Sequence, residues 1–149
     1  MPEINTILSP VDFSDTSEYA LQYAVDLASQ LNAEVKVIHV YQFPAFTVPE
    51  SEFVAPLNSD FEADYPARLQ EQVDNLVERY VSSGVKVTGG LAEGVPYSEI
   101  VRTAKELSAD LIVLGTHGRT GLAHLLLGSV AERVVRLSPI PVLTVRHTE

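Results

Sequence analysis

Strand-like and helix-like patterns alternate along the chain, and this alternation restricts its fold more than any other feature. Aliphatic and β-branched residues form five short runs, at residues 4–8, 35–40, 85–91, 111–114 and 141–145. Apolar residues recur at helical spacing at residues 20–31, 69–80, 100–107 and 130–137. Because the strand runs are almost continuously apolar, we expect a single Rossmann-like α/β domain, with helices on both faces of a five-stranded parallel sheet.

The order of the strands decides where a ligand would bind. Right-handed crossovers leave few arrangements, and the common one is 3-2-1-4-5. In that order the winding direction reverses between the first and fourth strands, and ligands bind beyond the carboxyl ends of the strands at the reversal. The first strand runs into Pro10 and Asp12, and the fourth runs into Gly115. We therefore expect these loops to meet at one crevice.

Several residues mark where helices start and stop. Asp15, three residues before Glu18, is the expected N-cap of the first helix. Gly84 is expected to close the second helix, and Pro96 to be the first residue of the third.

Residues 42–66 do not fit the repeat. They contain four prolines, five acidic residues and no basic residue, which is typical of a long surface loop. Such a loop is either a solvated insertion or, since long loops in compact domains are often functional, a lid or subunit contact.

Length and composition narrow the class of protein. A chain of 149 residues suits one domain, so we expect residues 1–149 to form a single unit. Without cysteine there is no disulfide, thiolate nucleophile or thiolate metal site. A net charge of −10 argues against nucleic-acid binding, which needs a basic face. Because the sequence shows neither a leader peptide nor an apolar run of membrane-spanning length, we expect a cytoplasmic protein without membrane insertion.

A glycine-rich loop follows the fourth strand. Gly115, Gly118, Gly128 and Ser129 give the spacing G-x2-G-x9-G-S. Backbone N–H groups in such a loop, and at the start of the helix that follows, can bind phosphate oxygens. Alternatively the glycines serve only a turn with positive φ. The spacing matches neither G-x-x-x-x-G-K-[ST] nor G-x-G-x-x-G, so the two common nucleotide motifs are absent.

The glycine pattern resembles that of the ATP-binding branch of the universal stress protein family. The similarity extends to other segments of this chain, namely Pro10-Val11-Asp12 after the first strand, His39-Val40 at the end of the second, and Pro139-Ile140-Pro141-Val142 near the C-terminus. It covers nearly the whole chain and leaves mainly residues 42–66 outside.

The resemblance implies an adenine nucleotide, ATP in the first place, in the crevice. It places the counterpart of Asp12 against the nucleoside and the backbone at Val40 against the adenine. The glycines and the hydroxyl of Ser129 would surround the ribose and the phosphates. Arg119 is a further phosphate partner because a guanidinium can bind two oxygens at once. The residues expected to bind nucleotide are Pro10, Asp12, Val40, Gly115, Gly118, Arg119, Gly128 and Ser129.

Each of these residues also has a purely structural interpretation. Ser129 begins a capping box with Glu132, in which the two side chains satisfy the first amides of the last helix. Asp12 is a candidate cap of the first helix together with Ser14, and Arg119 is a candidate for an ordinary solvated side chain. A carboxylate beside a triphosphate also suits Mg²⁺, but the sequence identifies no metal site because Mg²⁺ needs few protein ligands.

Three functions are compatible with these features. The first is an ATP-binding regulatory or stress-response module with at most slow ATP hydrolysis, since no phosphate-loop lysine and no residue to orient an attacking water is evident. The second is a nucleotide-free scaffold that works as a homodimer through the last strand, Val142–Val145, because an apolar edge strand calls for cover. The third is an enzyme on the same fold, for which the sequence offers no nucleophile or general base.

Overall fold

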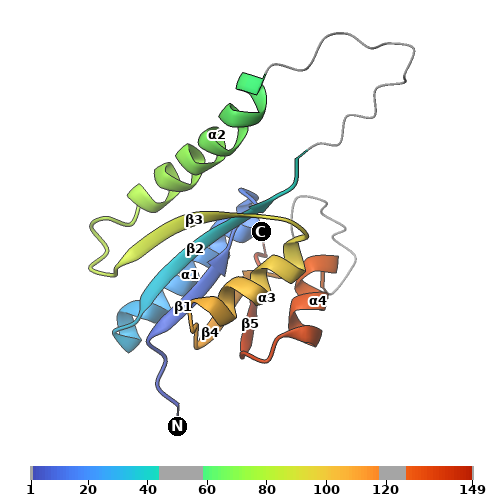
Figure 1. Cartoon of the computed structure of the whole chain (residues 1–149). Coiled ribbons are helices and arrows are strands. Elements are labelled where there is room, and N and C mark those ends of the chain that lie inside the picture. The colour runs from blue at the N-terminus through green and yellow to red at the C-terminus, as the bar shows by residue number, and fades with distance from the viewer. Residues whose placement is uncertain (1, 44–58, 118–126, 149) are drawn as a thin grey trace.

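The computed structural model describes residues 2–43, 59–117 and 127–148 and shows one parallel sheet with the strand order β3-β2-β1-β4-β5 (Figure 1). This confirms the predicted fold class and strand order. The strands are β1 (Thr6–Pro10), β2 (Glu34–Tyr41), β3 (Val87–Glu93), β4 (Leu111–Gly115) and β5 (Val142–Val145). The helices are α1 (Asp15–Leu31), α2 (Ser59–Glu78), α3 (Pro96–Glu106) and α4 (Ser129–Leu137).

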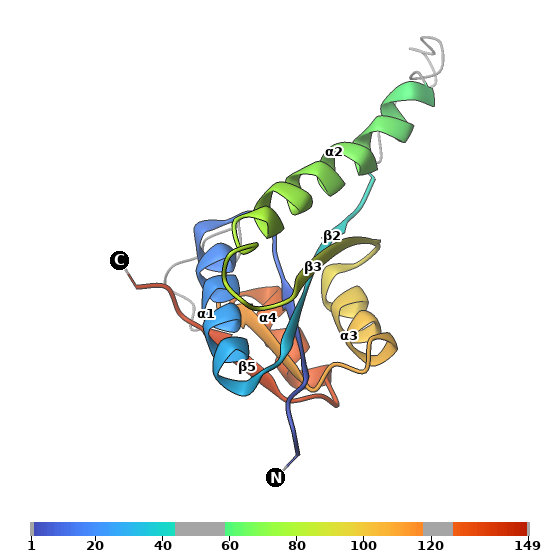
Figure 2. The ribbon, with the colours of Figure 1, turned by 90° about the vertical axis from the view of Figure 1, so that its left-hand side faces the viewer.

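Helices cover both faces of the sheet, α1 and α2 on one and α3 and α4 on the other (Figure 2). Successive side chains of a strand point to opposite faces, so each strand contributes to two apolar clusters. In β1, Ile7 belongs to the cluster under α1 and α2, whereas Leu8 belongs to the cluster under α3 and α4, and both are fully buried. This two-sided burial explains why the strand sequences are apolar without alternation.

The long loop predicted at residues 42–66 was placed wrongly at its C-terminal end. Helix α2 begins at Ser59 and contains Pro66, which lies within the predicted loop. Tyr65, in the N-terminal half of α2, packs against the end of β2. Its ring centroid lies 5.9 Å from that of Tyr41 and 5.8 Å from that of Phe43. Tertiary contacts of this kind offset the hydrogen bond that a proline removes from a helix.

The helix boundaries differ from prediction in two further places. The N-cap of α1 is Ser14, one residue before the predicted Asp15, and its hydroxyl accepts a hydrogen bond from the Ser17 amide at 3.2 Å. Gly84 does not close α2, which ends at Glu78; it has a φ of +78° in the turn that leads to β3. Pro96, in contrast, is the predicted first residue of α3.

In the described part of the chain, no helix is both long and apolar enough to cross a lipid bilayer.

Candidate functional site

A cavity of about 300 Å³ opens where the winding of the sheet reverses, beyond the carboxyl ends of β1 and β4. This volume is at the lower end of the range of small-molecule sites. Six of the eight residues expected to bind nucleotide line it, whereas Gly118 and Arg119 lie outside the described residues. The six are Pro10, Asp12, Val40, Gly115, Gly128 and Ser129.

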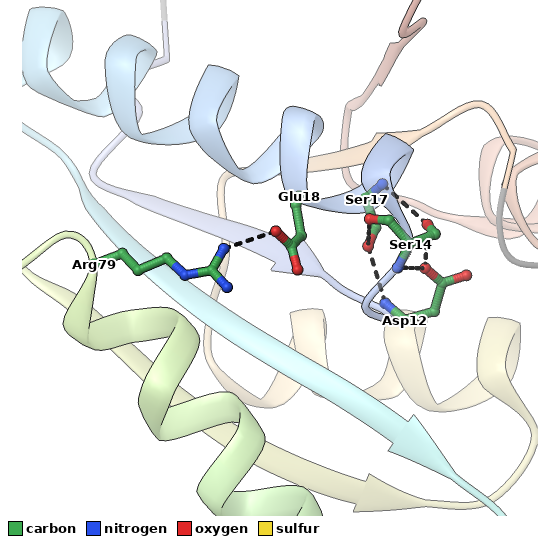
Figure 3. A network of polar contacts seen from close by, with 5 residues as sticks. All are labelled: Asp12, Ser14, Ser17, Glu18 and Arg79. Carbon is green, nitrogen blue, oxygen red and sulfur yellow. Dashed lines mark hydrogen bonds and ion pairs between the residues drawn. The ribbon is translucent and has the colours of Figure 1, made fainter.

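The turn after β1 holds Asp12 in a network of hydrogen bonds (Figure 3). The Oδ1 atom of Asp12 accepts from the Ser14 amide at 3.0 Å and also from the Ser14 hydroxyl. The Asp12 amide donates to the Ser17 hydroxyl at 3.2 Å. Asp12 therefore helps to shape the start of α1 and lines the cavity at the same time, so the structural and the ligand-binding interpretations of this residue are compatible.

An ion pair outside the cavity steadies the same helix. Arg79, just after α2, donates to Glu18 in the first turn of α1 at 2.8 Å, as Figure 3 shows. The Arg79 side chain is 62% exposed, so this pair contributes at most about 1 kcal/mol. It links α1 with the end of α2 on one face of the sheet, and neither of its charged side chains lines the cavity.

The backbone N–H and C=O of Val40 lie beyond the point where the pairing of β2 with β1 ends. The ladder between β1 and β2 ends at the pair Pro10–Ile38, whereas β2 continues beside β3 to the pair Tyr41–Glu93. Backbone groups alternate in direction along a strand. Because the Ile38 carbonyl accepts from Val11 on the β1 side, the N–H and C=O of Val40 face that same side, beyond the ladder. These groups are placed to recognise the edge of a flat polar ring.

The two described ends of the glycine-rich loop are joined at Thr116. The Thr116 amide donates to the Val145 carbonyl at 3.0 Å, and the Thr116 carbonyl accepts from the Gly128 amide at 2.6 Å. Thr116 is buried, with 6% of its surface exposed. The start of α4 is thus fixed beside the end of β4.

The predicted capping box at Ser129 was wrong. The N-cap of α4 is Gly128, which has an extended conformation and makes no side-chain cap, and Ser129 is the first helical residue. A hydroxyl at that position is one residue too late to cap the first turn. The first amides of an α-helix have no acceptor within the helix, and the helix dipole favours an anion there. The start of α4 therefore offers the cavity a group of anion-binding donors.

Nine further residues line the cavity, and none of them was predicted from the sequence as part of a site. Three are polar, namely Ser17, Thr116 and His117, and six are apolar and come from the turn after β1, from α3, from β4 and from α4. Pro96 and Val130 stand at helix starts that the sequence did mark, so the rule that helices begin at the carboxyl edge of a parallel sheet could have found them. The apolar lining residues are Val11, Pro96, Ile100, Leu114, Val130 and Ala131.

Charged groups are few in the described lining. Asp12 is its one carboxylate, His117 is its one histidine, and it has no lysine or arginine. Across residues 2–43, 59–117 and 127–148, no cluster of three or more histidine or acidic side chains is suited to a metal ion. The cavity thus combines apolar walls, one carboxylate and a helix start, which suits a flat heterocycle that carries a polar and anionic extension.

Comparison with known proteins identifies relatives over nearly the whole chain. The model of the universal stress protein family matches residues 3–146. Universal stress protein MJ0531 from Methanocaldococcus jannaschii is 39% identical over 140 residues, which cover 94% of this chain and 81% of that protein. Universal stress protein MJ0577 from the same organism is 34% identical over 159 residues, with 95% and 94% coverage.

Solved structures show the same fold. The structure of MJ0577 superposes with a TM-score of 0.78 at 32% identity and covers 99% of both chains. A universal stress protein crystallised in complex with cAMP superposes with a TM-score of 0.72 at 25% identity, with 97% and 98% coverage.

Proposed function

Because this chain belongs to the universal stress protein family, we propose that it binds an adenine nucleotide, ATP in the first place, and acts as a nucleotide-dependent regulatory module. The observation that carries this proposal is the composition of the cavity, in which apolar walls lead to the start of α4 at the reversal of the sheet. The relative that was crystallised with cAMP supports the choice of an adenine nucleotide.

Each part of the ligand has a suitable partner. The adenine would lie between the apolar walls, with its edge against the backbone of Val40. Asp12 would accept hydrogen bonds from the ribose, and the amides at Ser129 and Val130 would receive phosphate oxygens. Gly118 and Arg119 stay predictions for the outer phosphates.

The lining favours binding over chemistry. Efficient phosphoryl transfer needs a cation on the phosphates and a residue that orients the attacking water. The described lining has no lysine or arginine, and its one carboxylate already accepts hydrogen bonds from Ser14. Mg²⁺ bound with ATP would neutralise phosphate charge and needs few protein ligands. We therefore expect at most slow ATP hydrolysis.

A homodimer through β5 is the second part of the proposal. This strand lies at the edge of the sheet, and α1 beside it carries two partly exposed aromatic residues, Tyr19 and Tyr23, which are 45% and 46% exposed. Exposed aromatic residues next to an open strand edge suit a second copy of the chain. In a nucleotide-free scaffold this interface alone would carry the function. Cytoplasmic location and the lack of nucleic-acid binding stay predictions.

The first experiment asks whether the purified protein carries or takes up nucleotide. The protein is prepared without added nucleotide and denatured, and released small molecules are identified by mass spectrometry. Calorimetry with ATP, ADP, AMP and cAMP follows. Adenine nucleotide near one equivalent, or saturable binding, supports the proposal. If no nucleotide is released and none of the four nucleotides gives binding heat, the proposal is overturned. The scaffold hypothesis then takes first place.

Two matched variants on α4 connect binding to this cavity. Val130 lines it near the start of the helix, whereas Val135 is exposed by 45% and does not line it. Val130→Asp places a negative charge where phosphates would lie, yet suits the helix N-terminus. Val135→Asp disfavours the C-terminal end of the helix but leaves the cavity unchanged. We expect loss of binding in the first variant only; equal binding by both would place the nucleotide elsewhere.

A further inference from the structure

His39 lies outside the cavity and connects the segment that contains Asp12 with the strand that contains Val40. Its Nδ1 atom lies 2.8 Å from the carbonyl oxygen of Val11, and since a carbonyl can only accept, Nδ1 carries the proton. The Val11 amide donates to the Ile38 carbonyl, also at 2.8 Å. The residue before Asp12 is thus held at both its N–H and its C=O by the two residues that precede Val40.

A strained residue adds a second contact to the same ring. Phe13 has a φ of +63°, a left-handed conformation that bulky residues rarely adopt. The other two described non-glycine residues with positive φ, Asn32 and Ser108, follow the ends of helices, where this conformation is common. Phe13 instead lies in the turn between β1 and α1, and its ring centroid is 4.6 Å from that of His39. Packing on His39 therefore helps to hold the strained turn.

We infer that His39 is a positioning residue, which sets the spacing between Asp12 and Val40 and so selects ligands that reach both. It is not among the residues that line the cavity, and it acts through Val11 and Phe13. A free base needs only the Val40 side of the cavity, whereas a nucleoside needs both sides at one fixed separation. The inference rests on the proposed function, because it assumes that adenosine spans these two residues.

The test compares adenine with adenosine in two variants of His39. His39→Asn keeps an N–H donor close to the position of Nδ1, whereas His39→Leu keeps an apolar side chain without a donor. We expect His39→Leu to weaken adenosine binding by about tenfold or more, since small misplacements of a binding group are costly. Its adenine affinity should stay within about twofold of the wild type, and His39→Asn should restore much of the adenosine affinity.

A second histidine provides the control. The His147 ring stacks on Tyr19 at 4.6 Å, and His147 does not line the cavity. His147→Leu should leave both affinities unchanged. An equal loss of adenine and adenosine binding in His39→Leu, or no rescue in His39→Asn, would overturn the inference.

Measurements without ligand separate this inference from the proposed function. The ¹⁵N shifts of His39 should show a protonated Nδ1, and hydrogen exchange of the Asp12 amide should quicken in His39→Leu but not in His39→Asn. If the wild type binds neither adenosine nor any of the adenine nucleotides, the proposed function fails and selection between adenine and adenosine fails with it. An unchanged Asp12 amide in His39→Leu would instead overturn the positioning role even where nucleotide binds.

Discussion

Gly115 packs so closely against Thr16 that a Cβ atom at Gly115 would lie 2.7 Å from Cγ2 of Thr16 and 3.1 Å from its carbonyl oxygen. The glycine at the end of β4 is therefore required by the approach of α1, whatever the loop beyond it binds. Loss of nucleotide binding in a Gly115 variant would not by itself locate the ligand, which is why we place the binding test at Val130.

Replacing Gly115 by alanine should destabilise the protein by about 1–3 kcal/mol, because backbone atoms of α1 have to move. Gly90 is the matched control, since a Cβ atom there meets nothing within 4 Å. Urea unfolding at equilibrium measures both variants. A Gly115→Ala variant as stable as Gly90→Ala would show that α1 shifts without cost.

The two serines at helix starts should differ in their contribution to stability. Ser14→Ala removes the cap of α1 and should cost about 1 kcal/mol. Ser129→Ala, at the first helical position of α4, should change the free energy of unfolding by less than about 0.5 kcal/mol. Thermal and urea unfolding decide the matter. If Ser129→Ala lowered the free energy of unfolding more than Ser14→Ala, the result would support a capping box at Ser129 and contradict this prediction.

Glu34 should make stability depend on pH in the acidic range. Its hydrogen bond with Lys86 lowers the pKa of Glu34, and Lys36 adds to this effect against the opposing influence of burial. A lowered pKa in the folded state stabilises the protein above the unfolded pKa of about 4.3, and this contribution is lost as the pH falls through the folded value.

Glu34→Gln should therefore be less stable than the wild type at pH 7, and the difference should shrink as the pH falls below about 4. Urea unfolding at a series of pH values measures it. Glu71→Gln, which alters an exposed residue of α2, is the control. A difference that grows toward acidic pH would contradict the sign of the shift.

Thr144→Pro should separate the proposed dimer. The Ile112 and Thr116 amides donate to the carbonyls of Pro141 and Val145, so the backbone alternation turns the N–H of Thr144 toward the open edge of β5. Proline is tolerated at an edge strand but cannot donate there. Light scattering should give the mass of two chains for the wild type and for Thr144→Val, and of one chain for Thr144→Pro. A wild type with the mass of one chain would refute the dimer.

Much of the framework could be predicted from the sequence because it follows from local patterns. Apolar runs without alternation predict strands buried on both faces, and the right-handed crossover rule then leaves few orders. This reasoning alone predicts that Asp12 and Gly115 lie at one crevice. The end of the loop at 42–66 was predicted wrongly because Pro66 is a helix breaker locally, whereas contacts of Tyr65 with β2 favour the helix.

The sequence by itself determined the α/β fold and, once the common strand order is assumed, the edge of the sheet at which a ligand would bind, since these depend on periodicity and chain handedness. Only the tertiary structure decided the separate roles of the residues at that edge. The fit of Gly115 against Thr16, the hold of His39 on Val11 and the open backbone of Val40 arise between segments far apart in the chain. Their physical basis is contact distance, which no local pattern specifies.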